Sequence, residues 1–391
     1  MLLGAAVLLN YIDRGAIGIA APVMKTELGL SPKTYGLAFS AFFWVYAPVQ
    51  LFTGWLCDRF SVYRLMAFGI LLWAGSTLLM GFVGSFVGLM VLRIILGVGE
   101  SISFPGSSKI IARHVPPERR GVANAAIAAG IAWGPAVGTL AGGLIVASAG
   151  WRAMFFVFGL LTLTWLLPWH RTVRSLADSG RPDGGAHVSV RSIASHWSLW
   201  SMSIVHCLGN YCFYFLLAWL PLYLVQSRGF TITQMTMLAT LGYAVQGACA
   251  ITYGHFSDWW TRSGHSEAAC RRWMMVASQL IAAAAILGLA FAHSTTQIAL
   301  LLCLAGAASG SLSLNIYAVA QMFSGPRAAG TWIGVQNAFG NVSGIAGPII
   351  TGIIVQQAGY ESAFVVTAAI AAFGAIWWAV GVPAIRQVEL V

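Results

Sequence analysis

Four charged side chains lie inside stretches of sequence that are otherwise apolar. Asp13 and Arg14 interrupt the first stretch, and Arg93 and Glu100 lie seven residues apart in a later one. Seven residues are about two helical turns, so Arg93 and Glu100 would face the same side of a helix. A guanidinium can hold a carboxylate through two parallel hydrogen bonds, and a buried carboxylate changes its protonation as its neighbours change. These residue types indicate anion binding combined with proton exchange.

A charged side chain in the middle of a membrane costs about 3 kcal/mol on insertion scales, so it is retained where it pairs or meets an ion or a substrate. We therefore expect Arg14 to bind the acid group of a substrate. Asp13 and Glu100 are expected to carry protons, with Arg93 modulating Glu100. The alternative is a buried Arg–Glu pair that only ties helices together.

The composition is that of a membrane protein. Of the 391 residues, 58% are hydrophobic and 8% are charged, whereas an ordinary soluble domain has about 25% charged residues. The net charge of +10 does not indicate nucleic-acid binding, because the basic residues are scattered through short loops instead of clustered. The six cysteines show no metal-ligand spacing, so we expect neither disulfides nor a metal or cofactor.

Apolar windows between polar breaks predict twelve helices, since about 20 apolar residues span a bilayer. The expected ranges are 2–24, 35–57, 65–83, 86–108, 121–147, 153–169, 199–225, 235–257, 273–292, 297–322, 329–355 and 361–382. The polar, turn-rich stretch 170–198 is expected to be a cytoplasmic linker. It would join an N-terminal six-helix bundle (1–169) to a C-terminal six-helix bundle (199–391).

The basic residues predict the orientation in the membrane. Of the 21 Lys and Arg residues, fifteen fall in the termini and loops of one side, and only Lys25, Lys33, Arg152 and Arg228 fall on the other. Cytoplasmic loops carry the excess of Lys and Arg in membrane proteins. Both termini are therefore expected in the cytoplasm, with the chain in a bacterial inner membrane.

The two halves of the sequence repeat each other. The segment from Gly54 to Asp58 returns as the segment from Gly254 to Asp258. A longer match at an offset of 209 aligns the region of the fifth and sixth expected helices with that of the last two. It pairs Gly121 with Gly330, Gly138 with Gly347, Gly143 with Gly352 and Gly150 with Gly359. Such repeats place a substrate site between the halves near the bilayer midplane, and alternating access is the implied mechanism.

Three segments resemble the major facilitator superfamily, namely Gly54 to Arg64, Arg93 to Glu100, and Gly130 to Gly138. Asn10-Tyr11-Ile12-Asp13-Arg14 together with Gly99-Glu100-Ser101 resembles its anion:cation symporter family. That family includes proton-coupled galactonate, glucarate and hexuronate carriers of bacteria and also sialin. The resemblance implies an all-α membrane fold of twelve helices in two pseudo-symmetric halves, and proton-coupled symport of a small organic anion. It also implies proton coupling by Asp13 and Glu100, and substrate binding by Arg14.

Neutral polar and aromatic residues are expected to complete the substrate site. They are Tyr11, Tyr46, Gln50, Trp133, Asn210, Tyr211, Ser311, Asn337 and Asn341. Sugar-acid carriers of the resembled family tend to have Gln near Trp133, so an aromatic or short-chain acid is favoured over a heavily hydroxylated one. Asp58, Arg59 and Asp258 lie at expected cytoplasmic helix ends and are interpreted as gating residues.

Two alternatives follow from other features. Gly134-Pro135, with 16 Trp and 21 Phe, is compatible with a proton-driven efflux antiporter for amphipathic compounds, although Arg14 would repel cationic drugs. An enzyme or receptor is disfavoured, because the sequence has no His-Glu-x-x-His motif and no phosphate-binding glycine loop. The expected partners are a small organic acid, protons and the lipid bilayer, with the protein acting as a monomer and without nucleic acid.

Overall fold

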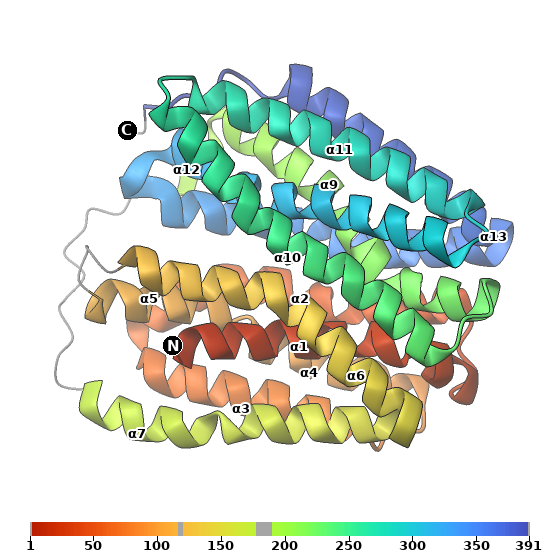
Figure 1. Cartoon of the computed structure of the whole chain (residues 1–391). Helices are drawn as coiled ribbons and strands as arrows, with labels where there is room; N and C mark the ends of the chain where they lie inside the picture. Colours follow the sequence, from red (N-terminus) through yellow and green to blue (C-terminus); the bar gives the residue numbers. More distant parts are fainter. Residues whose placement is uncertain (1, 116–119, 177–189, 390–391) are drawn as a thin grey trace. The chain divides into compact units, whose positions relative to one another are not determined.

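The computed structural model describes residues 2–115, 120–176 and 190–389, and the regular structure of these residues is entirely helical (Figure 1). The first half contains α1 (Leu2–Glu27), α2 (Pro32–Arg59), α3 (Val62–Met80), α4 (Phe86–Glu100), α5 (Ser103–His114), α6 (Arg120–Thr164) and α7 (Leu166–Leu176). The second half contains α8 (Val190–Ala194), α9 (Trp197–Leu222), η2 (Tyr223–Ser227), α10 (Ile232–Arg262), α11 (Glu267–Phe291), α12 (Thr295–Gly340), α13 (Val342–Ile376) and η3 (Trp377–Gly381). Part of the expected linker, 177–189, lies outside the described residues.

Nine helical segments among the described residues are long and apolar enough to cross a membrane. Two of them, Ala126–Val173 and Thr331–Gly381, contain 48 and 51 residues. At about 1.5 Å per residue, each is more than twice as long as a bilayer core of about 30 Å. Each is broken by a glycine in the left-handed region, Gly150 (φ 84°) or Gly359 (φ 79°), and can supply two spans. The all-helical membrane fold is confirmed, and the count of twelve spans stays a prediction.

The structure shows the sequence repeat in its turns. At an offset of 200, Gly29 and Gly229 both adopt left-handed φ values, 62° and 71°. The next helix is then capped by Ser31 in one half and Thr231 in the other, whose side-chain oxygens accept backbone N–H groups three residues on. At an offset of 209, the N-caps of α4 and α12 are both serines with the same bond. The repeat therefore extends to backbone conformation.

The described residues group into two compact units, each considered by itself. The first contains the described residues up to 176 together with Leu217–Thr240, and the second contains residues 190–216 and those from 241 on. Leu217–Thr240 belongs to the first unit because it packs there. For example, the Tyr35 hydroxyl donates to the carbonyl oxygen of Ala218 at 2.9 Å. The division into bundles at 1–169 and 199–391 stays a prediction about the sequence halves.

In the first unit, α1 lies along α6 (Figure 1). The contact is close because glycines recur every four residues on α6. A Cβ atom built on Gly130, Gly134 or Gly138 would come within 2.8, 2.5 or 2.9 Å of atoms of α1. Gly134 therefore serves the packing of α6 against α1, and the antiporter stays an alternative.

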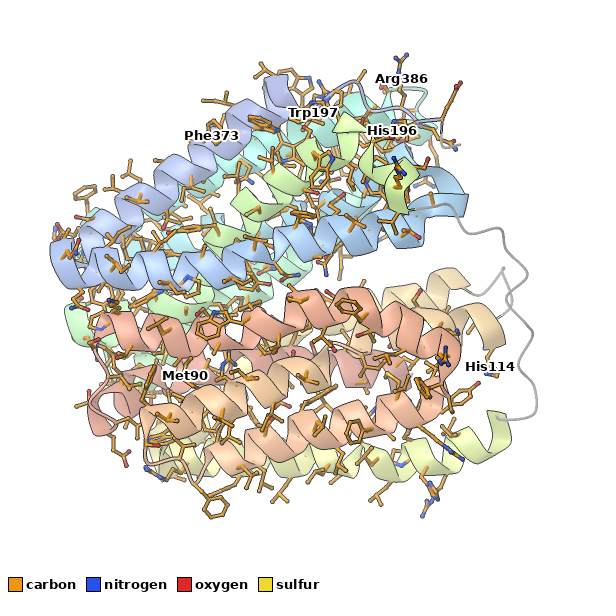
Figure 2. The ribbon with its side chains drawn as sticks, turned by 180° about the vertical axis from the view of Figure 1, so that it is seen from behind. Met90, His114, His196, Trp197, Phe373 and Arg386 are labelled. Atoms are coloured by element: carbon orange, nitrogen blue, oxygen red, sulfur yellow. The ribbon has the colours of Figure 1, made fainter. Side chains whose placement is uncertain are left out.

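In the second unit, a core of apolar side chains joins α8, α9, α11, α12 and the segment after α13. Its largest members include Phe323, Trp332 and Trp378. His196, Trp197 and Arg386 lie at the same end of this unit (Figure 2). There the Val388 amide donates to the carbonyl oxygen of Phe323 at 2.9 Å, which holds the C-terminal segment against α12.

Candidate functional site

A buried ion pair links α1 and α4 in the first unit. The guanidinium of Arg14 donates to Glu100 Oε2 through Nη2 at 2.9 Å and through Nε at 3.2 Å. Nη2 also donates to Asn10 Oδ1 at 3.2 Å. Glu100 and Asn10 are fully buried and Arg14 is 3% exposed. Charges removed from water in this way are retained only with good pairing, so this pair is the electrostatic centre of the unit.

Three aromatic rings surround the guanidinium of Arg14. Its Cζ lies 4.9 Å from the ring centroid of Tyr11, 5.1 Å from that of Phe42 and 4.7 Å from that of Tyr46. Ring faces attract a cation and hold its planar fork in one orientation. The Tyr46 ring is itself fixed by stacking on Phe42, with centroids 4.9 Å apart. The orientation of the Arg14 guanidinium is thus fixed by the rings as well as by Glu100.

Asp13, the neighbour of Arg14 on α1, points to different helices. Its Oδ2 accepts a hydrogen bond from Trp73 Nε1 of α3 at 2.8 Å and one from Thr162 Oγ1 of α6 at 3.0 Å. The side chains of Trp73 and Thr162 are fully buried and Asp13 is 2% exposed. The two adjacent charges of α1 therefore lie in separate polar environments.

Arg93 makes its hydrogen bonds to the backbone of α2. Its Nη2 donates to the carbonyl oxygen of Phe39 at 2.8 Å and its Nε to that of Ala38 at 3.3 Å. The guanidinium also lies 5.1 Å from the ring centroid of Phe42. Arg93 therefore fixes the helix that carries Phe42 and Tyr46, while the hydrogen bonds of Glu100 go to Arg14.

Several polar atoms around these charges have no hydrogen-bond partner among the described residues. They include Glu100 Oε1, Asp13 Oδ1 and Asn10 Nδ2, all of them buried. A buried ionised oxygen without a donor is costly, whereas the same oxygen bearing a proton is neutral. Both carboxyl groups therefore present one oxygen that suits a proton.

The second unit carries neutral polar residues. The Tyr214 hydroxyl donates to Asn341 Oδ1 at 2.7 Å, and Asn341 Nδ2 donates to the carbonyl oxygen of Asn337 at 2.8 Å. Asn210 Nδ2 donates to the carbonyl oxygen of Gly340 at 3.2 Å. This group lies where α12 ends and α13 begins, at Asn341. Side-chain amides of this group therefore bind backbone carbonyls next to the break.

The other expected substrate-site residues are each described within their own unit. Gln50 is partly buried and donates to the Tyr46 hydroxyl at 3.5 Å, and Trp133 is 38% exposed. Tyr211 shares a hydrogen bond of 3.0 Å with Thr351, while the buried Ser311 hydroxyl donates to a backbone carbonyl of α11 at 3.5 Å.

Of the expected gating residues, Arg59 and Asp258 are exposed. The backbone carbonyl of Asp258 accepts a hydrogen bond from Arg262 Nε at 3.1 Å. The side chain of Asp58 lies outside the described part of the chain.

Sequence reasoning missed five residues that contact the charged or polar groups: Asn10, Phe42, Trp73, Thr162 and Tyr214. A signal was available for Trp73, because an indole N–H buried in an apolar helix needs an acceptor. Another was available for Tyr214, which lies at the offset of 200 from Arg14. Among the described residues, no group of three or more His, Cys, Asp or Glu side chains could hold a metal ion.

The sequence profile described as Major Facilitator Superfamily matches residues 3–264 and 266–388. The chain is 29% identical to a probable sulfoacetate transporter of Cupriavidus necator, over 96% of this chain and 92% of that protein. It is 30% identical to a probable galactarate/D-glucarate transporter of Bacillus subtilis, over 90% of this chain and 84% of that protein. A bacterial homolog of the human lysosomal transporter Spinster has a similar fold, with a TM-score of 0.84 at 18% identity over 98% and 96% of the two chains.

Proposed function

The chain belongs to the Major Facilitator Superfamily, and we propose that it carries a small organic anion together with protons by alternating access. Like its family and its relatives, it is a transporter and not an enzyme. The observation that supports the proposal is the buried pair of Arg14 and Glu100, in which a protein carboxylate occupies the guanidinium that a substrate would need.

The pair suggests how an anion and a proton travel together. When Glu100 takes a proton, its charge is lost and its hold on Arg14 weakens, so the acid group of a substrate can bind the guanidinium. The net charge of the buried group is then unchanged, because one anion has replaced another. A bound proton and a bound anion therefore favour each other, which is the thermodynamic requirement for symport.

The relatives support the choice of substrate class. Their names specify sulfoacetate in one case and galactarate or D-glucarate in another, all of them small acids. We propose that Asn337, Asn341 and the neighbouring polar residues of the second unit bind the part of the substrate away from its acid group. The resemblance puts a Gln of the sugar-acid carriers near Trp133, so we propose a short-chain or aromatic acid over a heavily hydroxylated one.

We also propose a location and an orientation for the transporter. The excess of Lys and Arg in the loops of one side supports an orientation with both termini in the cytoplasm, and we propose a bacterial inner membrane as the location. Asp58, Arg59 and Asp258 would contribute to gating at the cytoplasmic ends of α2 and α10. The protein would act as a monomer.

Uptake into proteoliposomes tests the function. An inward gradient of about one pH unit supports roughly tenfold accumulation of an anion coupled to one net proton. Labelled sulfoacetate and D-glucarate are offered, with and without an uncoupler. We expect accumulation of at least one of them by the unaltered protein, abolished by the uncoupler and by Glu100→Gln, which cannot take up a proton.

Glu361→Gln is the matched control, because Glu361 is exposed on α13 and its substitution should leave accumulation unchanged. A Glu100→Gln protein that still accumulates the acid under the gradient contradicts the coupling role. If no acid accumulates and proton-driven dye extrusion is seen instead, the efflux antiporter is the better description.

A further inference from the structure

The two hydrogen bonds that Asp13 accepts both fall on one carboxyl oxygen. Trp73 Nε1 and Thr162 Oγ1 donate to Oδ2 at 2.8 and 3.0 Å, whereas Oδ1 is buried without a partner. We propose that Trp73 and Thr162 are positioning residues that direct the coupling proton to Oδ1 of Asp13 and set the pH at which it is released. This inference rests on the proposed function, in which Asp13 is one of the proton carriers.

The geometry matches a neutral carboxylic acid. In such a group one oxygen is a carbonyl that accepts hydrogen bonds, and the other bears the proton. Oδ2 is the acceptor here, because an indole N–H donates and cannot accept. Oδ1 is left as the oxygen to which the proton binds. Ionised Asp13 would instead leave a buried, charged Oδ1 without any donor, which is costly.

The other charged and titratable groups of this interior are engaged elsewhere. Arg14 and Glu100 bond to each other, and the hydrogen bonds of Arg93 go to α2 carbonyls. Tyr11 places its ring against Arg14. From α3 and α6, the groups that contact Asp13 are the indole and the hydroxyl. Glu100 acts on Asp13 through its charge without bonding to it. Within the described residues Asp13 makes no ion pair, and the groups that donate hydrogen bonds to it are both neutral.

Release of the proton breaks the O–H bond at Oδ1 and leaves the electron pair on the carboxylate, while the proton passes to water. Trp73 and Thr162 then stabilise the resulting charge, because hydrogen bonds to an ionised group are stronger than those to a neutral one. Loss of either donor penalises the ionised form more than the neutral one. Proton release should then require a higher pH.

Infrared titration of the purified transporter in liposomes tests this without any substrate. The carbonyl band of the protonated carboxyl is assigned to Asp13 by its loss in Asp13→Asn, and its intensity is followed against pH. We expect Trp73→Phe and Thr162→Val each to move the midpoint upward by about one pH unit, the effect of one hydrogen bond to a charged group. Thr162→Ser, which keeps the hydroxyl, should restore the original midpoint.

Two variants serve as matched controls. Trp378 is fully buried with an indole N–H that lacks a partner among the described residues, and Thr367 bonds to a carbonyl of its own helix. Trp378→Phe and Thr367→Val should leave the midpoint unchanged.

Unchanged midpoints in both Trp73→Phe and Thr162→Val overturn the inference, as does a shift in the controls of the same size. Thr162→Val keeps the shape of the side chain, so the result does not depend on whether Trp73→Phe folds. The band is read without transport, so failure of anion uptake by the unaltered protein would count against the proposed function and leave the titration to decide the roles of Trp73 and Thr162.

Discussion

Arg14→Ala is expected to abolish anion uptake and to destabilise the protein by about 3 kcal/mol, since removing one member of a buried ion pair leaves the other charge uncompensated. In this protein the charge left behind is Glu100, which is fully buried and whose Oε2 accepts two hydrogen bonds from Arg14. Thermal unfolding in detergent should show the loss as a drop in Tm of about 4 °C. The drop should shrink at acidic pH, where Glu100 can be neutralised by a proton.

The double variant Arg14→Ala, Glu100→Gln separates the two effects. Neutralising Glu100 removes the stranded charge, so Tm should largely recover while uptake stays absent. Arg152→Ala is the control, because Arg152 pairs with Glu27 at an exposed site, and surface pairs contribute below about 1 kcal/mol. If Arg14→Ala is no less stable than Arg152→Ala, the pair of Arg14 and Glu100 is not the electrostatic centre described above.

Gly97→Ala is expected to be the most damaging single methyl addition to α4. Gly97 is buried where α4 meets α2, and a Cβ atom there would come within 2.3 Å of the carbonyl oxygen of Phe42. That neighbour is backbone, so relief requires a shift of α2 itself, and overpacking of this kind costs about 1 to 3 kcal/mol. Because Phe42 also stacks on Tyr46 and faces Arg14, substrate affinity should fall along with Tm.

Gly75→Ala provides the matched comparison on α3, since a Cβ atom there would meet nothing within 4 Å. In that helix the change should be neutral or slightly stabilising, because alanine favours helix by about 1 kcal/mol over glycine. Equal melting temperatures for Gly97→Ala and Gly75→Ala would show that α2 and α4 can separate at no cost.

Hydropathy predicted the helices because a bilayer requires apolar segments of nearly fixed length. It could not predict where a helix is interrupted inside the membrane. The fourth expected helix, 86–108, ends at Glu100 and resumes as α5 at Ser103, and the eleventh, 329–355, is divided at Asn341. Neither break contains a proline or a glycine with positive φ that would mark it in the sequence. Tertiary packing decides the backbone at these points.

The charged residues of the site could be found from their insertion cost alone, but their partners could not. Helical spacing placed Arg93 and Glu100 on one face of a helix, but it contains no information about the neighbouring helices. The partner of the Glu100 carboxylate comes from α1, and the acceptors of the Arg93 guanidinium come from α2. Trp73 and Thr162 were missed for the same reason, because they are remote in sequence from Asp13. Spacing predicts faces of one helix, and contacts between helices require the fold.

The repeated turns have an evolutionary consequence. Duplication copied the glycines and the helix caps, but the four membrane charges exist in one copy only: at the repeat offsets, Asp13 corresponds to Phe213, Arg14 to Tyr214, Arg93 to Leu302 and Glu100 to Ser309. Under the proposed function, residues of the second half, which lacks these charges, can be substituted to bind a new acid while the proton-binding residues of the first half stay unchanged. Sequence differences between relatives that carry different acids should therefore be concentrated in the second half of the chain.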